Sequence, residues 1–179
     1  MTDRIQTSYP GMILAPIEKE DLETLVLHLN DLELYRNTLS IPHPYTMNDA
    51  INYFRQVRNF ERKYGKRKEW SIRYNSRLIG GAGALMNYGP DSHKTEIGYW
   101  LASPYRGKGM MSAAVMALTR QLFSEWGFVR LEANVFSYNP ASCRVLEKCG
   151  FEQEGVLKKF CKKDGEYLDT FLYSLLKSE

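Results

Sequence analysis

The sequence predicts a single α/β (more strictly α+β) domain, residues 1–179, in which helices flank one twisted, mostly antiparallel sheet. The 179 residues, 44% apolar and 25% charged, have the length and composition of one globular domain. Apolar positions recur with helix and strand spacing in the order β-αα-βββ-α-β-α-ββ. One helix connects two strands of the expected sheet, and such a crossover joins parallel strands. We therefore expect a mixed sheet with one parallel pair.

The first half of the chain predicts one strand, two helices and three further strands. Met12–Ile17 is a short apolar strand, and a helix follows from about Lys19. A second helix begins near Thr46, because Thr46 and Asp49 come close to a capping box. The next strands are Glu69–Tyr74, Leu78–Met86 and Lys94–Ala102, with turns at Asn75-Ser76 and Asn87–His93.

The second half predicts two helices, a strand and a final hairpin. One helix runs from about Gly107 to Trp126 and stops at Gly127. A strand follows, and then a shorter helix from Asn139-Pro140 to Gly150, whose asparagine cap, first-turn proline and terminal glycine are typical of helices. The strands are Arg130–Phe136, Glu154–Cys161 and Glu166–Leu176, and the last two join through Lys163-Asp164-Gly165, a hairpin signal.

Composition and charge exclude several classes of protein. The longest near-apolar runs, Ile79–Met86 and Met110–Leu118, are shorter than the ~20 residues of a membrane helix. The N-terminus lacks the apolar segment of a secretion signal. Three cysteines without C-x-x-C spacing indicate reduced thiols and neither a disulfide framework nor a zinc site. A net charge of +3 does not favour nucleic-acid binding. We expect a soluble, cytoplasmic protein without membrane, nucleic-acid or metal partners.

The segment that most strongly suggests chemistry lies between Glu96 and Met111. It predicts a strand, a tight loop and a helix start, and the loop contains two glycines. Glycines leave backbone N–H groups unshielded where the helix dipole is positive, and such a helix start binds phosphate oxygens. Its spacing is not that of a Walker loop. A glycine-rich helix entry that binds nothing is the alternative interpretation.

This loop resembles a coenzyme-binding motif of one enzyme family. Arg106-Gly107-Lys108-Gly109-Met110-Met111 is similar to the acyl-CoA pyrophosphate loop of the GNAT N-acetyltransferases, Gln/Arg-x-x-Gly-x-Gly/Ala, although Met111 stands where Gly or Ala is usual. The preceding Glu96–Leu101 and the later Asn139–Ser142 and Glu147–Phe151 resemble the RimJ/RimL branch, which acetylates the N-termini of ribosomal proteins. The likeness covers nearly the whole chain.

The resemblance implies a GNAT-like fold with acetyl-CoA as co-substrate. In that fold the strands predicted at Lys94–Ala102 and Arg130–Phe136 splay apart and pantetheine lies between them. Backbone groups near Tyr99–Leu101 would bind it and polarise the thioester carbonyl, as in an oxyanion hole. The residues that the resemblance assigns to acetyl-CoA are Tyr99, Trp100, Leu101, Arg106, Gly107, Lys108, Gly109, Met110, Met111, Asn139 and Ser142.

Ser142 is the catalytic acid that the resemblance favours. Many GNATs place a tyrosine acid at the position of Leu146, whereas RimL-type enzymes use the serine at the position of Ser142 to protonate the departing CoA thiolate. Without the resemblance, Ser142 is a capping or solvated hydroxyl in the first turn of a helix, and Asn139 is simply that helix's N-cap.

Glu96 is the leading candidate for the general base. The attacking amine must be neutral, and an α-amine (pKa ~8) meets this condition far more often at pH 7 than a lysine (pKa ~10.4). An α-amine therefore needs only modest help. Strand alternation places Glu96 on the face of Gly98 and Trp100. Glu132 or water is the alternative base. Glu96 could also have no catalytic role and be a surface carboxylate that is hydrated or paired with a lysine.

These residues predict an acetyl-CoA-dependent N-acetyltransferase that works by direct attack in a ternary complex. A protein N-terminal α-amine is the preferred acceptor, and a small amine such as a polyamine or aminoglycoside is the alternative. A non-catalytic acyl-CoA-binding module is the alternative of another class. The sequence leaves open a homodimer, a substrate contact by His43, and the role of the basic cluster Arg55–Lys68. That cluster is either a solvated helix end or a contact for an acidic partner or the CoA 3′-phosphate.

Overall fold

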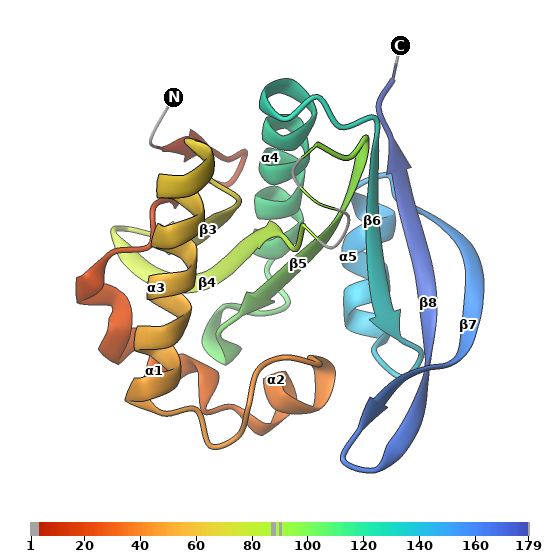
Figure 1. Ribbon diagram of the computed structural model, residues 1–179, viewed down its shortest axis with the longest axis horizontal. Helices are drawn as coiled ribbons and strands as arrows, with labels where there is room; N and C mark the ends of the chain where they lie inside the picture. The colour runs from red at the N-terminus through yellow and green to blue at the C-terminus, as the bar shows by residue number, and fades with distance from the viewer. Residues whose placement is uncertain (1–3, 87–88, 90, 179) are drawn as a thin grey trace.

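The computed structural model describes residues 4–86, 89 and 91–178, which form one sheet with helices on both faces (Figure 1). The strands are β1 (Ile5–Gln6), β2 (Met12–Ala15), β3 (Glu69–Tyr74), β4 (Arg77–Ala84), β5 (Lys94–Leu101), β6 (Arg130–Phe136), β7 (Glu152–Lys163) and β8 (Glu166–Leu176). The helices are α1 (Leu22–Leu29), α2 (Leu32–Asn37), α3 (Met47–Tyr64), α4 (Met110–Glu125) and α5 (Pro140–Lys148).

The eight strands lie in the order β1-β2-β3-β4-β5-β6-β8-β7. All neighbouring pairs are antiparallel except β5 and β6, which are parallel. The long crossover through α4 joins these two strands, as parallel neighbours require. The predicted mixed, mostly antiparallel sheet is therefore confirmed.

Two elements were not predicted, and two predicted helices begin later than expected, one of them α4, which begins at Met110 and not near Gly107. β1 has two residues and α2 has six, which is too short for either to show a clear apolar period. α2 depends instead on its cap, because the Asp31 side chain accepts hydrogen bonds from the N–H groups of Glu33 and Leu34. The helix expected from Lys19 opens with a 3₁₀ turn and becomes α-helical at Leu22. The turn predicted at 87–93 lies partly outside the described residues.

The helix-end signals are confirmed at α3 and α5. At the start of α3, the Thr46 side chain accepts from the Asp49 N–H at 3.3 Å, and the Asp49 carboxylate accepts from the Thr46 N–H at 2.8 Å. This reciprocal pair is a capping box. Asn139 caps α5, and Gly150 follows it with a left-handed φ of 85°.

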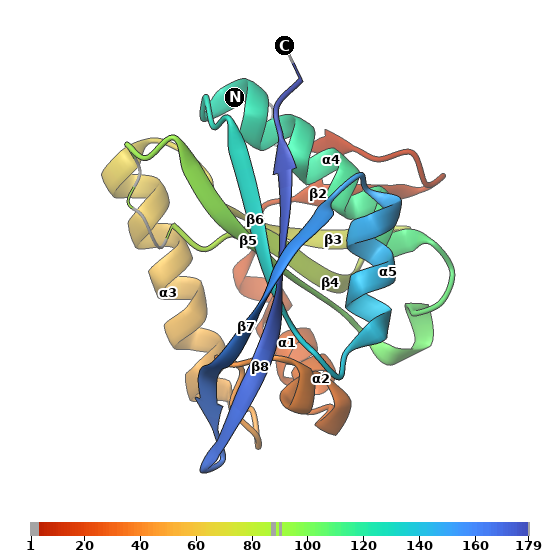
Figure 2. The same cartoon turned by 90° about the vertical axis from the view of Figure 1, so that its right-hand side faces the viewer.

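Apolar cores lie on both faces of the sheet. α4 and α5 cover one face over a core that includes Leu118, Leu131 and Leu146, and α1 and α3 cover the other face over Leu25 and Val57 (Figures 1 and 2). Each core fixes its helices against the sheet by burying apolar area. The sheet is therefore the middle layer, and any opening through it would connect the two helical layers.

Such an opening exists between β5 and β6. The two strands pair only at their first residues, and their ladder ends at Glu96 and Glu132. Beyond this point β5 remains paired with β4, from Ile97 to Leu101, and β6 remains paired with β8 as far as Phe136. The splayed strand pair implied by the resemblance is therefore present, and it leaves one edge of each strand without a strand partner.

Candidate active site

A cavity of about 900 Å³ occupies the gap between β5 and β6. Tyr99, Trp100 and Leu101 line it from the part of β5 that lies beyond the ladder with β6. The start of α4 and the first turn of α5 line it from one face of the sheet. The segment after α2, together with β7 and β8, lines it from the other face. The cavity therefore brings together residues from both helical layers.

The start of α4 has the geometry of an anion site. Its N-cap is Gly109, which has a left-handed φ of 78°, and no side chain caps the helix. Gly107 has a φ of 73°, and apart from the chain neighbours of each glycine no atom of the described residues lies within 4 Å of where a Cβ would stand at either one. The first N–H groups of a helix have no intrahelical acceptor. Met110, Met111 and Ser112 line the cavity at this point, so their amides are placed where an anion in the cavity could reach them.

The two cations of this loop bind elsewhere in the protein. The Arg106 guanidinium contacts the carboxylates of Asp31 at 2.7 Å and Glu33 at 2.6 Å, which ties the loop to α2. Lys108 Nζ donates to the carbonyl of Pro104 at 2.8 Å and does not line the cavity. The phosphate role predicted for both side chains is untested. Backbone amides and the helix dipole add positive potential at this loop.

Ser142 is held by two neighbours in the first turn of α5. Its N–H donates to Asn139 Oδ1 at 3.1 Å, and its Oγ lies 2.8 Å from the hydroxyl of Tyr99. Burial raises the pKa of Tyr99 above its usual range, so the phenol is neutral at any ordinary assay pH and can exchange a proton with Ser142. Leu146, at the position of the usual tyrosine acid, is fully buried.

The side-chain contact of Tyr99 was missed in the sequence. We expected Tyr99 to contribute only backbone groups to the site. Strand alternation carried the missing signal, because a residue next to Gly98 and Trp100 must face the opposite side of the sheet, where the crossover helices pack. What the sequence did not supply was the rotation of α5 that brings Ser142 onto that hydroxyl.

The opposite wall of the cavity combines carboxylates with apolar side chains. Glu96 lines it and is half-buried, and Glu69 accepts a hydrogen bond of 2.6 Å from the Tyr53 hydroxyl. Ile41 and Phe160 add apolar surface, and Phe160 is 53% exposed. Phe160 lies in a bulge of β7, where the register with β8 shifts between Leu157 and Cys161. Bulges of this kind re-aim side chains next to functional sites.

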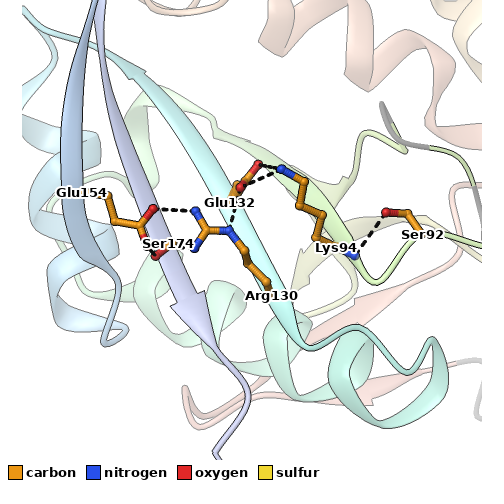
Figure 3. A network of polar contacts seen from close by, with 6 residues as sticks. All are labelled: Ser92, Lys94, Arg130, Glu132, Glu154 and Ser174. Carbon is orange, nitrogen blue, oxygen red and sulfur yellow. Dashed lines mark hydrogen bonds and ion pairs between the residues drawn. The ribbon is translucent and has the colours of Figure 1, made fainter.

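Glu132, the alternative base, belongs to a network of ion pairs outside the cavity lining (Figure 3). It is 4% exposed and accepts from Lys94 Nζ at 3.1 Å and from Arg130 Nε at 2.7 Å. Arg130 also forms a forked pair with Glu154, which accepts from Ser174 as well. The network joins four strands at the paired end of the gap. Glu96 is therefore the better placed of the two candidate bases.

The remaining candidates lie away from the cavity. The ring of His43 packs near Tyr35, with 5.7 Å between the ring centroids, and His43 does not line the cavity. None of the seven cations of the basic cluster lines it either. Arg58 and Arg67 pair with Glu61, and Lys66 lies over the Trp126 ring. Among the described residues, no group of three His, Cys, Asp or Glu side chains could hold a metal ion, and no helix is long and apolar enough to cross a membrane.

A sheet that forks beside an uncapped helix start is the arrangement of the GNAT fold, and it places the protein in the class of N-acetyltransferases. The comparison with known families agrees. Residues 12–152 match the family described as "Acetyltransferase (GNAT) domain". The chain therefore belongs to the GNAT acetyltransferase family, as the resemblance indicated.

The individual relatives are all acetyltransferases, and the two whose acceptors are stated differ in them. The chain is 30% identical over 172 residues to "Uncharacterized N-acetyltransferase p20" of Bacillus licheniformis, covering 94% of each chain. It is 27% identical over 168 residues to "L-amino acid N-acetyltransferase AaaT" of Escherichia coli, covering 93% of this chain and 98% of the relative. A solved structure of RimL, a ribosomal L7/L12 alpha-N-protein acetyltransferase in complex with coenzyme A, superposes with a TM-score of 0.85 at 20% identity, covering 97% of each chain.

Proposed function

We propose that this N-acetyltransferase transfers the acetyl group of acetyl-CoA to the α-amine at the N-terminus of a polypeptide. The observation that carries the proposal is that Ser142 and Glu96 line one cavity from opposite faces of the sheet. A thioester held in the gap would have a proton donor on one side and a proton acceptor on the other. This is the arrangement that direct acyl transfer to an amine requires.

Acetyl-CoA supplies the activated acetyl group, and the residues present fit it. The amides of Met110, Met111 and Ser112 would hold its diphosphate, and the edge of β5 that faces the gap would hold pantetheine and the thioester oxygen. One group near this edge, the Leu101 carbonyl, accepts from Arg106 Nε at 2.9 Å. Glu96 takes the proton that the amine loses as the new C–N bond forms. Ser142 Oγ gives its proton to sulfur as the C–S bond breaks, and it regains a proton from water through the Tyr99 hydroxyl, which stays neutral overall. Glu96 returns its proton to water after the products leave.

The charge distribution supports a polypeptide acceptor over a free amino acid. Three cations line the cavity: Arg106, Arg144 and Lys148. Arg106 is paired with the two carboxylates of α2, and the other two belong to α5, on the face of Ser142. The opposite wall of the cavity carries carboxylates and apolar side chains instead: Glu69, Glu96, Ile41 and Phe160. We call it the acceptor wall. It therefore suits an ammonium group with an apolar neighbour, whereas a free α-carboxylate would compete with Glu69 for Lys68, which pairs with that glutamate at 3.5 Å.

Thiol release from acetyl-CoA tests the proposal. Peptides with a free N-terminus, the same peptides with a blocked N-terminus, free amino acids and polyamines would be compared at equal concentration. We expect turnover with free-N-terminus peptides and a gain of one acetyl group at their first residue by mass spectrometry. Turnover confined to free amino acids or polyamines would overturn the choice of acceptor. Tight CoA binding without thiol release for any amine would instead favour the non-catalytic module.

A further inference from the structure

Two buried polar atoms at the cavity have no hydrogen-bond partner among the described residues. They are Oδ1 of Asn134 on β6 and Oγ1 of Thr170 on β8. Thr170 is 0% exposed, and both residues line the cavity. Buried polar atoms in folded proteins are nearly always paired, so an unpaired atom at a cavity wall indicates a missing ligand. Neither residue has a part in the proton transfers proposed above.

Strand register places both residues on the same face of the sheet as Glu96, with Asn134 one strand away and Thr170 two strands away. Asn134 lies two residues beyond Glu132, which is the last partner of Glu96 in the ladder, so Asn134 and Glu96 face the same side of the sheet. On β8, Thr170 is opposite Phe136, which makes it the diagonal neighbour of Asn134. Diagonal neighbours on one face are ~7–8 Å apart, within reach of one small group. Ser142 and Tyr99 lie on the other side of the sheet, towards α5.

The chemistry of the three side chains selects a ligand that donates hydrogen bonds. An amide oxygen and a carboxylate only accept, and a hydroxyl can also accept. We infer that Asn134 and Thr170 form an acceptor subsite, which binds backbone N–H groups of the incoming polypeptide behind its terminal amine and so directs that amine towards Glu96. This inference rests on the proposed function and adds to it the residues that hold the acceptor.

The test uses three single variants of the full chain and a peptide acceptor. Thr170→Val keeps the side-chain shape and removes the hydroxyl, and Asn134→Ala removes the amide. The control is Thr119→Val, a buried threonine on α4 that bonds the Met116 carbonyl and does not line the cavity. We expect KM for the peptide to rise about 5-fold or more in the first two variants, the effect of one lost hydrogen bond. KM for acetyl-CoA should stay within 2-fold in all three.

Thermal unfolding separates a binding role from a structural one. Because the Thr170 hydroxyl is unpaired in the free protein, Thr170→Val should leave Tm unchanged or raise it, and Thr170→Ser should restore the wild-type KM. A fall of Tm with unchanged KM would overturn the inference, and so would a rise of KM for acetyl-CoA alone, which would assign the pair to pantetheine. If either of these two results is found and the wild-type protein still acetylates peptides, only the inference fails and the proposed function is retained. Absence of wild-type turnover with every peptide would overturn both.

Discussion

Ser142 forms hydrogen bonds through both its backbone and its side chain, and these serve different purposes. The backbone N–H completes the Asn139 cap and fixes the start of α5. The hydroxyl, 2.8 Å from Tyr99, is thereby held at one position in the cavity. A serine that is already paired and oriented loses little conformational entropy on reaction, which is the benefit of preorganisation.

We expect Ser142→Ala to lower kcat about 100-fold near pH 7 with little change in KM for acetyl-CoA, because general acid catalysis contributes roughly 10²–10⁴-fold. Tyr99→Phe leaves the acid in place and removes only its partner, so we expect a smaller loss, about 10-fold. Steady-state thiol release across pH 6–9 checks both values. Unchanged turnover of Ser142→Ala over this range would rule out its assigned role.

Sequence analysis identified the side chains of this site more fully than their contacts. Ser142, Asn139 and Glu96 follow from motif spacing and strand alternation, and each lines the cavity. The ion pairs of Arg106 did not follow from the sequence, because they depend on α2, a six-residue helix whose position is fixed only in the folded chain. Local patterns identify residues, whereas long-range geometry assigns their partners.

At the scale of elements, the start of α4 combines a backbone requirement with a binding surface. Gly109 needs its left-handed conformation for the chain to enter the helix, and a side chain there would meet no neighbouring atom. Gly65 ends α3 in the same conformation, also in open space, but does not line the cavity. Comparing substitutions at the two glycines therefore separates the effect of backbone strain on stability from the effect of a changed loop on CoA binding.

Gly109→Ala and Gly65→Ala should each lower the free energy of unfolding by about 1 kcal/mol, the cost of a left-handed non-glycine residue. Only Gly109→Ala should weaken CoA, and we expect its Kd to rise at least several-fold because the amides of the loop shift. Urea unfolding and calorimetric titration with CoA measure the two effects. Equal CoA affinity in both variants would argue against the diphosphate site at this helix.

The ion-pair network in Figure 3 holds the closed end of the strand gap. Hydrogen bonds from Arg130, and then from Ser174, lower the pKa of Glu154 to about 2. A carboxylate with a lowered pKa in the folded state stabilises the protein above its ordinary pKa of ~4.3, and this stabilisation is lost as the pH falls towards 2. The network should therefore weaken in acid.

We expect Glu154→Gln to lower Tm relative to wild type above about pH 5, with the difference shrinking as the pH falls through about 2, because the wild-type carboxylate then takes up a proton and becomes neutral like the glutamine. Glu152→Gln, an exposed glutamate on the same strand, serves as the control and should show no such trend. Thermal melts between pH 2 and 7 provide the measurement. A difference that stays constant with pH would show that the ion pair does not contribute.

At the scale of the whole molecule, the fold was largely predictable from the sequence. Period, caps and turn residues are local signals, and they located the long helices and seven of the eight strands, β3, β6 and β8 with their observed bounds. The parallel pair followed from the helical crossover. The cavity did not follow from such signals, because the bulge that exposes Phe160 and the packing of α2 depend on contacts far apart in the chain.

CoA binding should stabilise the whole chain, because the unfolded chain has no such cavity. At a CoA concentration about 100 times Kd, linkage adds roughly 2.7 kcal/mol, which corresponds to a Tm rise of roughly 5–10 °C for a domain of this size. Gly109→Ala should show a smaller rise at the same CoA concentration. Differential scanning fluorimetry measures both shifts, and a Tm that does not respond to millimolar CoA would contradict the site.

The bridge from Arg106 to Asp31 and Glu33 joins the loop on the coenzyme side to the helix beside the acceptor wall. A mutation at Arg106 that weakens the binding of acetyl-CoA would also release α2. It would therefore disturb part of the surface proposed to bind the acceptor. The two halves of this cavity therefore cannot evolve independently. A mutation that changes the acceptor must also preserve the binding of acetyl-CoA.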